Sequence, residues 1–79
     1  MEKADLTQLK EGNSGLVVEI QGGSGLHHRL ESLGIRTGKR VTKVSSQLMR
    51  GPITLRVDTS QVALGYGMAR KIIVKVIKI

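Results

Sequence analysis

The chain has 79 residues, which fits one small domain spanning residues 1–79 and leaves no room for a second. It contains no cysteine, tryptophan or phenylalanine and one tyrosine, Tyr66. This composition excludes disulfides, cysteine-ligated metals, thiol nucleophiles and aromatic platforms for nucleic-acid bases or proline-rich peptides. Thirteen Lys and Arg against six Asp and Glu give a net charge of +7, which favours acidic or phosphate-bearing partners.

The N-terminal residues predict a turn and then a strand. Leu6 and Leu9 are three residues apart, so both face one side of a turn that packs on the core before Gly12. Residues 15–20 alternate with a period of two, which predicts a strand with one buried and one solvated face. The apolar residues that share one face of this strand are Leu16, Val18 and Ile20.

The spacing of leucines then predicts one helix, Ser24–Leu33, with Ser24 as its N-cap. Gly34 is placed to adopt the left-handed conformation after the helix, and Ile35 then folds back on Leu30 as in a Schellman motif. The leucines of the expected buried stripe are Leu26, Leu30 and Leu33.

The rest of the chain predicts four short strands separated by turns, at about 41–48, at 53–57, at a segment ending with 62–64, and at 72–79. Val41 and Val44 are three apart, which indicates a bulge or a change of face. Residues 65–70 form a turn or one turn of helix. Five strands and one helix predict a mainly β fold, a small, strongly bent antiparallel barrel with one short inserted α-helix.

The catalytic inventory is poor, because the serines have no His and Asp at spacings that indicate a triad. Gly22–Gly25 lies before the helix but lacks the spacing of a phosphate-binding loop or a dinucleotide fingerprint. We therefore expect no enzyme activity, no catalytic residues and no required cofactor.

Three side chains on the predicted helix are the candidates for metal binding. His27 and Glu31 are one helical turn apart, so they can share a cation such as ferrous iron or another divalent transition metal. His28 lies about 100° further round the helix. Such a site is open and weak, and the competing interpretation is that these are ordinary surface residues.

Charge is unevenly distributed along the chain. Residues 1–33 carry three basic and five acidic residues, a net charge of −2, whereas residues 34–79 carry ten basic residues and one acidic residue, a net charge of +9. The later strands therefore predict a docking surface for an acidic partner, the alternative being a solvated face. The candidate partner-binding residues are Leu48, Met49 and Arg50 in a loop, where apolar side chains beside an arginine are typical of interface anchors, and Arg56.

The run GGSGLHHRLESLGIRTG at residues 22–38 resembles the central signature of the ferrous iron transport protein A (FeoA) family, as does LKEGNSG at residues 9–15. The Gly51–Pro52 pair and the late VALG at residues 62–65 continue the resemblance, which covers about residues 6–76. It implies an SH3-like barrel with an inserted helix. It also implies an accessory protein of bacterial ferrous iron uptake whose partner is the membrane transporter FeoB, which carries a cytoplasmic G domain.

Together these observations predict a regulator or adaptor that docks on the cytoplasmic part of the transporter. Direct binding of iron, for sensing or delivery, is the alternative. The N-terminal segment has no signal-peptide pattern and no apolar run reaches the ~18 residues of a membrane span. We expect a cytoplasmic protein, monomeric in isolation, that its partner recruits to the inner face of the membrane. Nucleic-acid binding is supported by net charge alone, because a basic recognition helix and stacking aromatics are absent.

Overall fold

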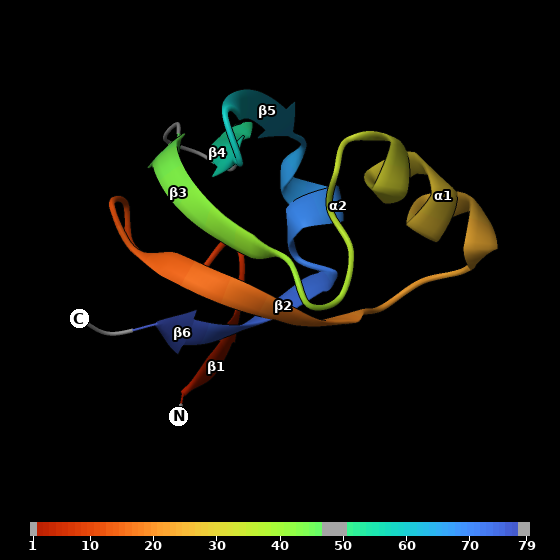
Figure 1. Cartoon of the computed structure of the whole chain (residues 1–79), viewed down its shortest axis with the longest axis horizontal. Helices are drawn as coiled ribbons and strands as arrows, with labels where there is room; N and C mark the ends of the chain where they lie inside the picture. The colour runs from red at the N-terminus through yellow and green to blue at the C-terminus, as the bar shows by residue number, and fades with distance from the viewer. Residues whose placement is uncertain (1, 47–50, 78–79) are drawn as a thin grey trace.

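A computed structural model of the chain describes residues 2–46 and 51–77. Its six strands and two helices are shown in Figure 1. In chain order they are β1 (Lys3–Asp5), β2 (Ser14–Ile20), α1 (Ser24–Ser32), β3 (Arg40–Ser46), β4 (Ile53–Val57), β5 (Ser60–Leu64), α2 (Tyr66–Ala69) and β6 (Ile72–Ile77).

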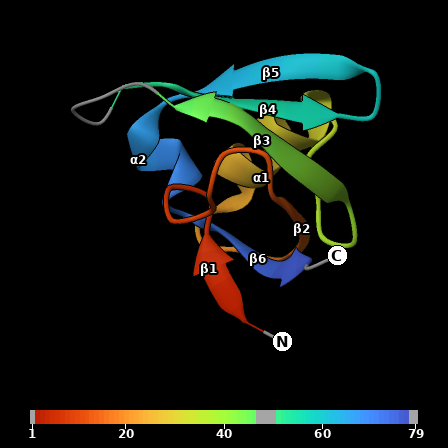
Figure 2. The ribbon, with the colours of Figure 1, turned by 90° about the vertical axis from the view of Figure 1, so that its left-hand side faces the viewer.

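All six strands belong to one antiparallel sheet in the order β1-β6-β2-β3-β4-β5. The sheet is rolled, so that β3, β4 and β5 arch over β1, β2 and β6 in Figure 2, and β1 and β5 remain its two edges. Helix α1 lies at one end of this roll in Figure 1 and is seen behind the strands in Figure 2. The arrangement confirms the mainly β, SH3-like fold with an inserted helix, with six strands in place of about five.

The additional strand is β1, which sequence patterning did not indicate. Its three residues, Lys3 to Asp5, have no apolar alternation, and they become a strand because they pair with β6, about seventy positions away. The turn that follows is as expected: Leu6 and Leu9 are both buried. The Asp5 carboxylate holds this turn by accepting hydrogen bonds from the backbone N–H and the hydroxyl of Thr7.

Strand β2 corrects the expected face assignment. Val17 is 1% exposed, whereas Leu16 is 37% exposed and lies outside the core. A bulge at Val18 changes the pairing register with β6 between Val17 and Glu19, so Ile20 returns to the core although Leu16 does not. The prediction of regular alternation over residues 15–20 was wrong, because the bulge inserts one extra residue between the buried positions Val17 and Ile20.

Strands β4 and β6 lie within the predicted ranges, and their residues alternate between buried and more exposed positions. Ile53, Leu55 and Val57 are buried on β4, and Ile72, Val74 and Val76 are buried on β6. Strand β3 contains the predicted bulge, where the register with β4 shifts between Lys43 and Ser45. Residues 47–48 and 78–79, which the predicted strands included, lie outside the described residues.

Helix α1 ends as the sequence predicts. Gly34 has a φ of +86°, its N–H donates to the Glu31 carbonyl at 2.9 Å, and the Ile35 N–H donates to the Leu30 carbonyl at 2.9 Å. These two bonds define a Schellman motif. The predicted start and stripe need correction, because the N-cap is Gly23 and Leu33 is 37% exposed.

Candidate partner-binding surface

A row of four outward-facing side chains crosses four neighbouring strands. The register pairs Lys3 of β1 with Lys75 of β6, Lys75 with Leu16 of β2, and Leu16 with Arg40 of β3. Directly opposed residues on adjacent strands have Cβ atoms about 4.5–5.5 Å apart. The row therefore places Leu16, one of two large apolar residues that the described structure leaves exposed, between two cations.

Arg56 extends this row onto β4. It pairs with Thr42, which lies two residues beyond Arg40 on the same face of β3, so the two guanidinium groups are diagonal neighbours. The Thr42 hydroxyl is hydrogen-bonded to the Ser14 hydroxyl at 2.7 Å. We call Lys3, Lys75, Leu16, Arg40 and Arg56 the basic band.

The cations of the basic band are not neutralised within residues 2–46 and 51–77. The ion pair found there joins Lys39 to Asp58 at 2.6 Å. It includes no lysine or arginine of the basic band. Like charges directly opposed on adjacent strands, as Lys3 and Lys75 are, destabilise a sheet. An acidic partner would relieve this repulsion and cover Leu16.

The band has a sharp boundary along β6. Ile73 lies two residues before Lys75 on the same face of β6, and it pairs with Asp5 of β1 and Glu19 of β2. An apolar residue between two acidic residues therefore lies next to the row that contains Lys75. Two neighbouring rows on the outer face of the sheet thus carry opposite charge.

The structure places one predicted docking residue, Arg56, in the band. Leu48, Met49 and Arg50 lie outside the described residues. Sequence reasoning missed the contributions of Lys3 and Leu16, which lie outside the basic second half of the chain. Exposure of Leu16 could have been suspected from the equally apolar Val17 beside it, which is an alternative core residue on the opposite face.

The predicted metal ligands lie on α1. His27 is half-buried, and its Nε2 lies 3.1 Å from the Ile20 carbonyl oxygen. Because a carbonyl only accepts, Nε2 is the donor in this contact, which leaves Nδ1 as the ring nitrogen that could bind a metal. His28 and Glu31 are exposed, and no cluster of three or more His, Cys, Asp or Glu side chains occurs in the part of the chain that the structure describes.

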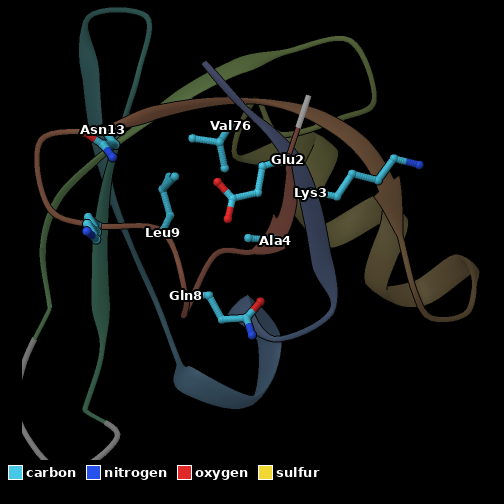
Figure 3. A pocket seen from close by; sticks show the side chains of 8 residues that line it. Glu2, Lys3, Ala4, Gln8, Leu9, Asn13 and Val76 are labelled. Carbon is cyan, nitrogen blue, oxygen red and sulfur yellow. The ribbon is translucent and has the colours of Figure 1, made fainter. Parts of the chain in front are cut away.

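A hollow of about 350 Å³ lies between β1 and the loop that precedes β2. Leu9 and Val76 line it with apolar surface, the Glu2 side chain points toward its centre, and Lys3 extends away from it (Figure 3). Glu2 is the one carboxylate on its wall and the wall has no histidine. The titratable groups of its lining are therefore one carboxylate, Glu2, and two lysines, Lys3 and Lys10.

Fold and surface together define a small SH3-like β domain whose main feature is a charged outer sheet face. Neither helix within residues 2–46 and 51–77 has the length and apolar content needed to cross a bilayer.

Comparisons with known proteins identify the family. The model of the FeoA domain matches residues 5–76. The chain is 36% identical over 66 residues to a protein of Methanocaldococcus jannaschii provisionally named Fe(2+) transport protein A, covering 84% of this chain and 78% of that protein. It is 33% identical over 72 residues to a Campylobacter jejuni protein with the same provisional name, covering 91% and 97%.

A crystal structure of an iron uptake regulatory protein (FeoA) superposes with a TM-score of 0.88 at 28% identity, covering 98% of this chain and all of that one. The chain therefore belongs to the FeoA family, whose members are accessory proteins of Fe(2+) transport.

Proposed function

We propose that this chain is a non-catalytic accessory protein of ferrous iron uptake that acts in the cytoplasm. It binds the cytoplasmic part of a FeoB-type transporter, and that contact holds it at the inner face of the membrane. The chain belongs to a family of Fe(2+) transport proteins, and this supports a role in ferrous iron uptake. The row of outward-facing cations around the exposed Leu16 supports a role in binding.

The observation that carries the docking proposal is the row Lys3–Lys75–Leu16–Arg40. An apolar side chain surrounded by cations without ion-pair partners is a surface suited to an acidic partner. The partner's carboxylates would pair with the cations, and an apolar group would cover Leu16, which is 37% exposed. Charged contacts of this kind accelerate association and weaken as salt rises.

A double charge reversal tests this surface. Arg40→Glu with Lys75→Glu should reduce affinity for the transporter's isolated cytoplasmic G domain by more than about tenfold, because two attractions become repulsions. Isothermal titration calorimetry provides the affinity. The matched control is Arg36→Glu with Lys71→Glu, which changes the net charge equally at exposed positions outside the band. Equal losses in both variants would refute the assignment of docking to the band.

Metal binding on α1 remains a second candidate, and the bond from His27 Nε2 to the Ile20 carbonyl favours it. A hydrogen bond from the second ring nitrogen fixes the tautomer and orientation of metal-binding histidines in general. Glu31 would be the other ligand. His27→Ala with Glu31→Ala should abolish binding of Fe²⁺ measured anaerobically; unchanged affinity would remove this site.

A further inference from the structure

The two edges of the sheet differ in how they are protected. Edge strands expose backbone N–H and C=O groups that can pair with another chain, and proteins usually block them with charge, proline, bulges or very short strands. Strand β5 has none of these devices. Its five residues, SQVAL, are uncharged and pair regularly with β4 from Val57↔Ser60 to Ile53↔Leu64.

The opposite edge, β1, is blocked. It has three residues, two of them charged, and the Asp5 N–H donates to the Gln8 side-chain oxygen at 3.1 Å. The Asp5 carboxylate in turn accepts from the Gln8 N–H at 3.2 Å. In a chain with a net charge of +7, the neutral and unblocked edge of the sheet formed by the described residues is therefore β5.

The register shows which groups of β5 are available. Val57 and Ser60 flank a two-residue turn, so they form a hydrogen-bonded pair, and hydrogen-bonded and non-bonded pairs then alternate along the hairpin. Gln61 and Ala63 fall at non-bonded positions, so their backbone groups point away from β4. Both residues are exposed. No hydrogen bond from other parts of the described chain reaches these two backbones.

We infer that β5 receives an extended acidic segment of a partner protein as a seventh strand of the sheet. We take the transporter of the proposed function as the source of that segment, and the inference rests on the proposed function in this respect alone. The mode is strand addition, in which main-chain hydrogen bonds supply affinity and alternate side chains supply specificity.

The side chains around β5 specify the segment's chemistry. On the outer face, Gln61 pairs with Arg56, so an acidic side chain beside Gln61 would lie two strand spacings, about 10 Å, from the Arg56 backbone, within reach of two extended side chains. On the inner face, Val62 is half-buried against the core. A segment that alternates acidic with aliphatic residues meets both requirements.

Charge also decides against a second copy of the chain as the occupant. Two copies would each bring +7 and would add no acid opposite Arg56, whereas an acidic strand neutralises it. Pairing of β5 with itself would be concentration-dependent in the absence of any peptide, and this distinguishes the two occupants.

The probe is a blocked seven-residue peptide that alternates glutamate with valine. Titrated into the labelled full chain, it should slow amide hydrogen exchange of Gln61 and Ala63 at least about tenfold at saturation and leave the Val62 amide, already bonded to β4, unchanged. A peptide alternating lysine with valine is the control for charge. Absence of protection at Gln61 and Ala63, equal binding of the lysine peptide, or protection that depends on protein concentration alone would each overturn the inference.

A paired substitution tests the main-chain contact. Ala63→Pro removes an outward N–H without removing a bond to β4, a position at which an edge strand accepts proline, and should weaken peptide binding at least about tenfold. Ala63→Ser keeps the N–H and should bind as the wild type does. If Ala63→Pro unfolds, the exchange measurement on the wild type decides.

In the last experiment, the transporter's cytoplasmic G domain replaces the peptide in the same exchange measurement. If it binds the basic band without protecting Gln61 and Ala63, strand addition is wrong and the proposed function stands. If the glutamate peptide protects both amides but the G domain does not bind, strand addition stands and the proposed partner is wrong.

Discussion

Lys43 is the residue whose environment departs furthest from sequence expectation. It is 4% exposed, and its ammonium group donates to the Leu9 carbonyl at 2.7 Å and the Thr7 carbonyl at 3.2 Å. Its backbone accepts from the Gly12 N–H at 2.7 Å and donates to the Asn13 carbonyl at 3.0 Å. The side chain of Lys43 and its backbone N–H and C=O thus hold residues 7–13 against β3.

Replacing this side chain tests its structural role. Lys43→Met removes both side-chain bonds and leaves two carbonyls without their donor, so the free energy of unfolding should fall by about 1–3 kcal/mol at pH 7. Urea denaturation measures it. Lys39→Met is the control, because its ion pair with Asp58 is exposed and such pairs contribute about 0–1 kcal/mol. Equal losses would mean that Lys43 does not fasten the segment.

The same residue predicts a pH dependence. Burial lowers the pKa of Lys43 below its ordinary value of 10.5, and the charges of Glu11 and Asp5 oppose this effect. Between the lowered folded pKa and 10.5, the unfolded chain binds more protons, so this group adds stability as pH rises. The stability difference between wild type and Lys43→Met should therefore widen from pH 7 toward pH 10.5 in denaturation curves. A constant or narrowing difference would contradict the direction of the shift.

At the scale of elements, the end of helix α1 depends on Gly34, the residue that follows its C-cap, Leu33. Gly34 has a φ of +86°, a conformation that costs residues with a Cβ about 1–2 kcal/mol. A Cβ added there would also approach Val57 Cγ1 at 3.4 Å. The Schellman bonds and the burial of Ile35 both depend on the left-handed turn at this position.

Two glycine substitutions in the same helical segment should have opposite signs. Gly34→Ala should lower the free energy of unfolding by about 1–2 kcal/mol. Gly25→Ala, inside α1 with open space around its Cβ, should raise it by up to about 1 kcal/mol. Thermal or urea unfolding of both variants gives the comparison. A stabilising effect at Gly34 would show that the turn is not held in the left-handed conformation.

Local sequence patterns correctly predicted the elements in which apolar residues recur at a regular spacing or a glycine marks the end. Strands β4 and β6 and the end of α1 belong to this group, because alternation or a glycine signal determined them without reference to distant residues. Leu16 was misplaced because the bulge at Val18 is visible only once β2 is paired with β6. Strand β1 and the burial of Lys43 depend on contacts across more than thirty positions, which no local pattern records.

At the scale of the whole molecule, the rolled sheet gathers charge that the sequence disperses. The basic second half predicted a positive surface and included Arg56, but the band also draws Lys3 from the first strand, where the local charge is negative. Nonlocal pairing of β1 with β6 makes this possible. The positive charge of the candidate site was therefore predictable from the sequence. The residues that form it could be identified only once the strand order was known.

A two-dimensional amide NMR titration with the transporter's cytoplasmic G domain tests most directly whether the basic band is the docking surface. At low and then physiological salt, shifts should centre on Lys3, Leu16, Arg40, Arg56 and Lys75, and the affinity should fall as salt rises. Absence of shifts, or shifts confined to His27 and Glu31 on α1, would contradict it.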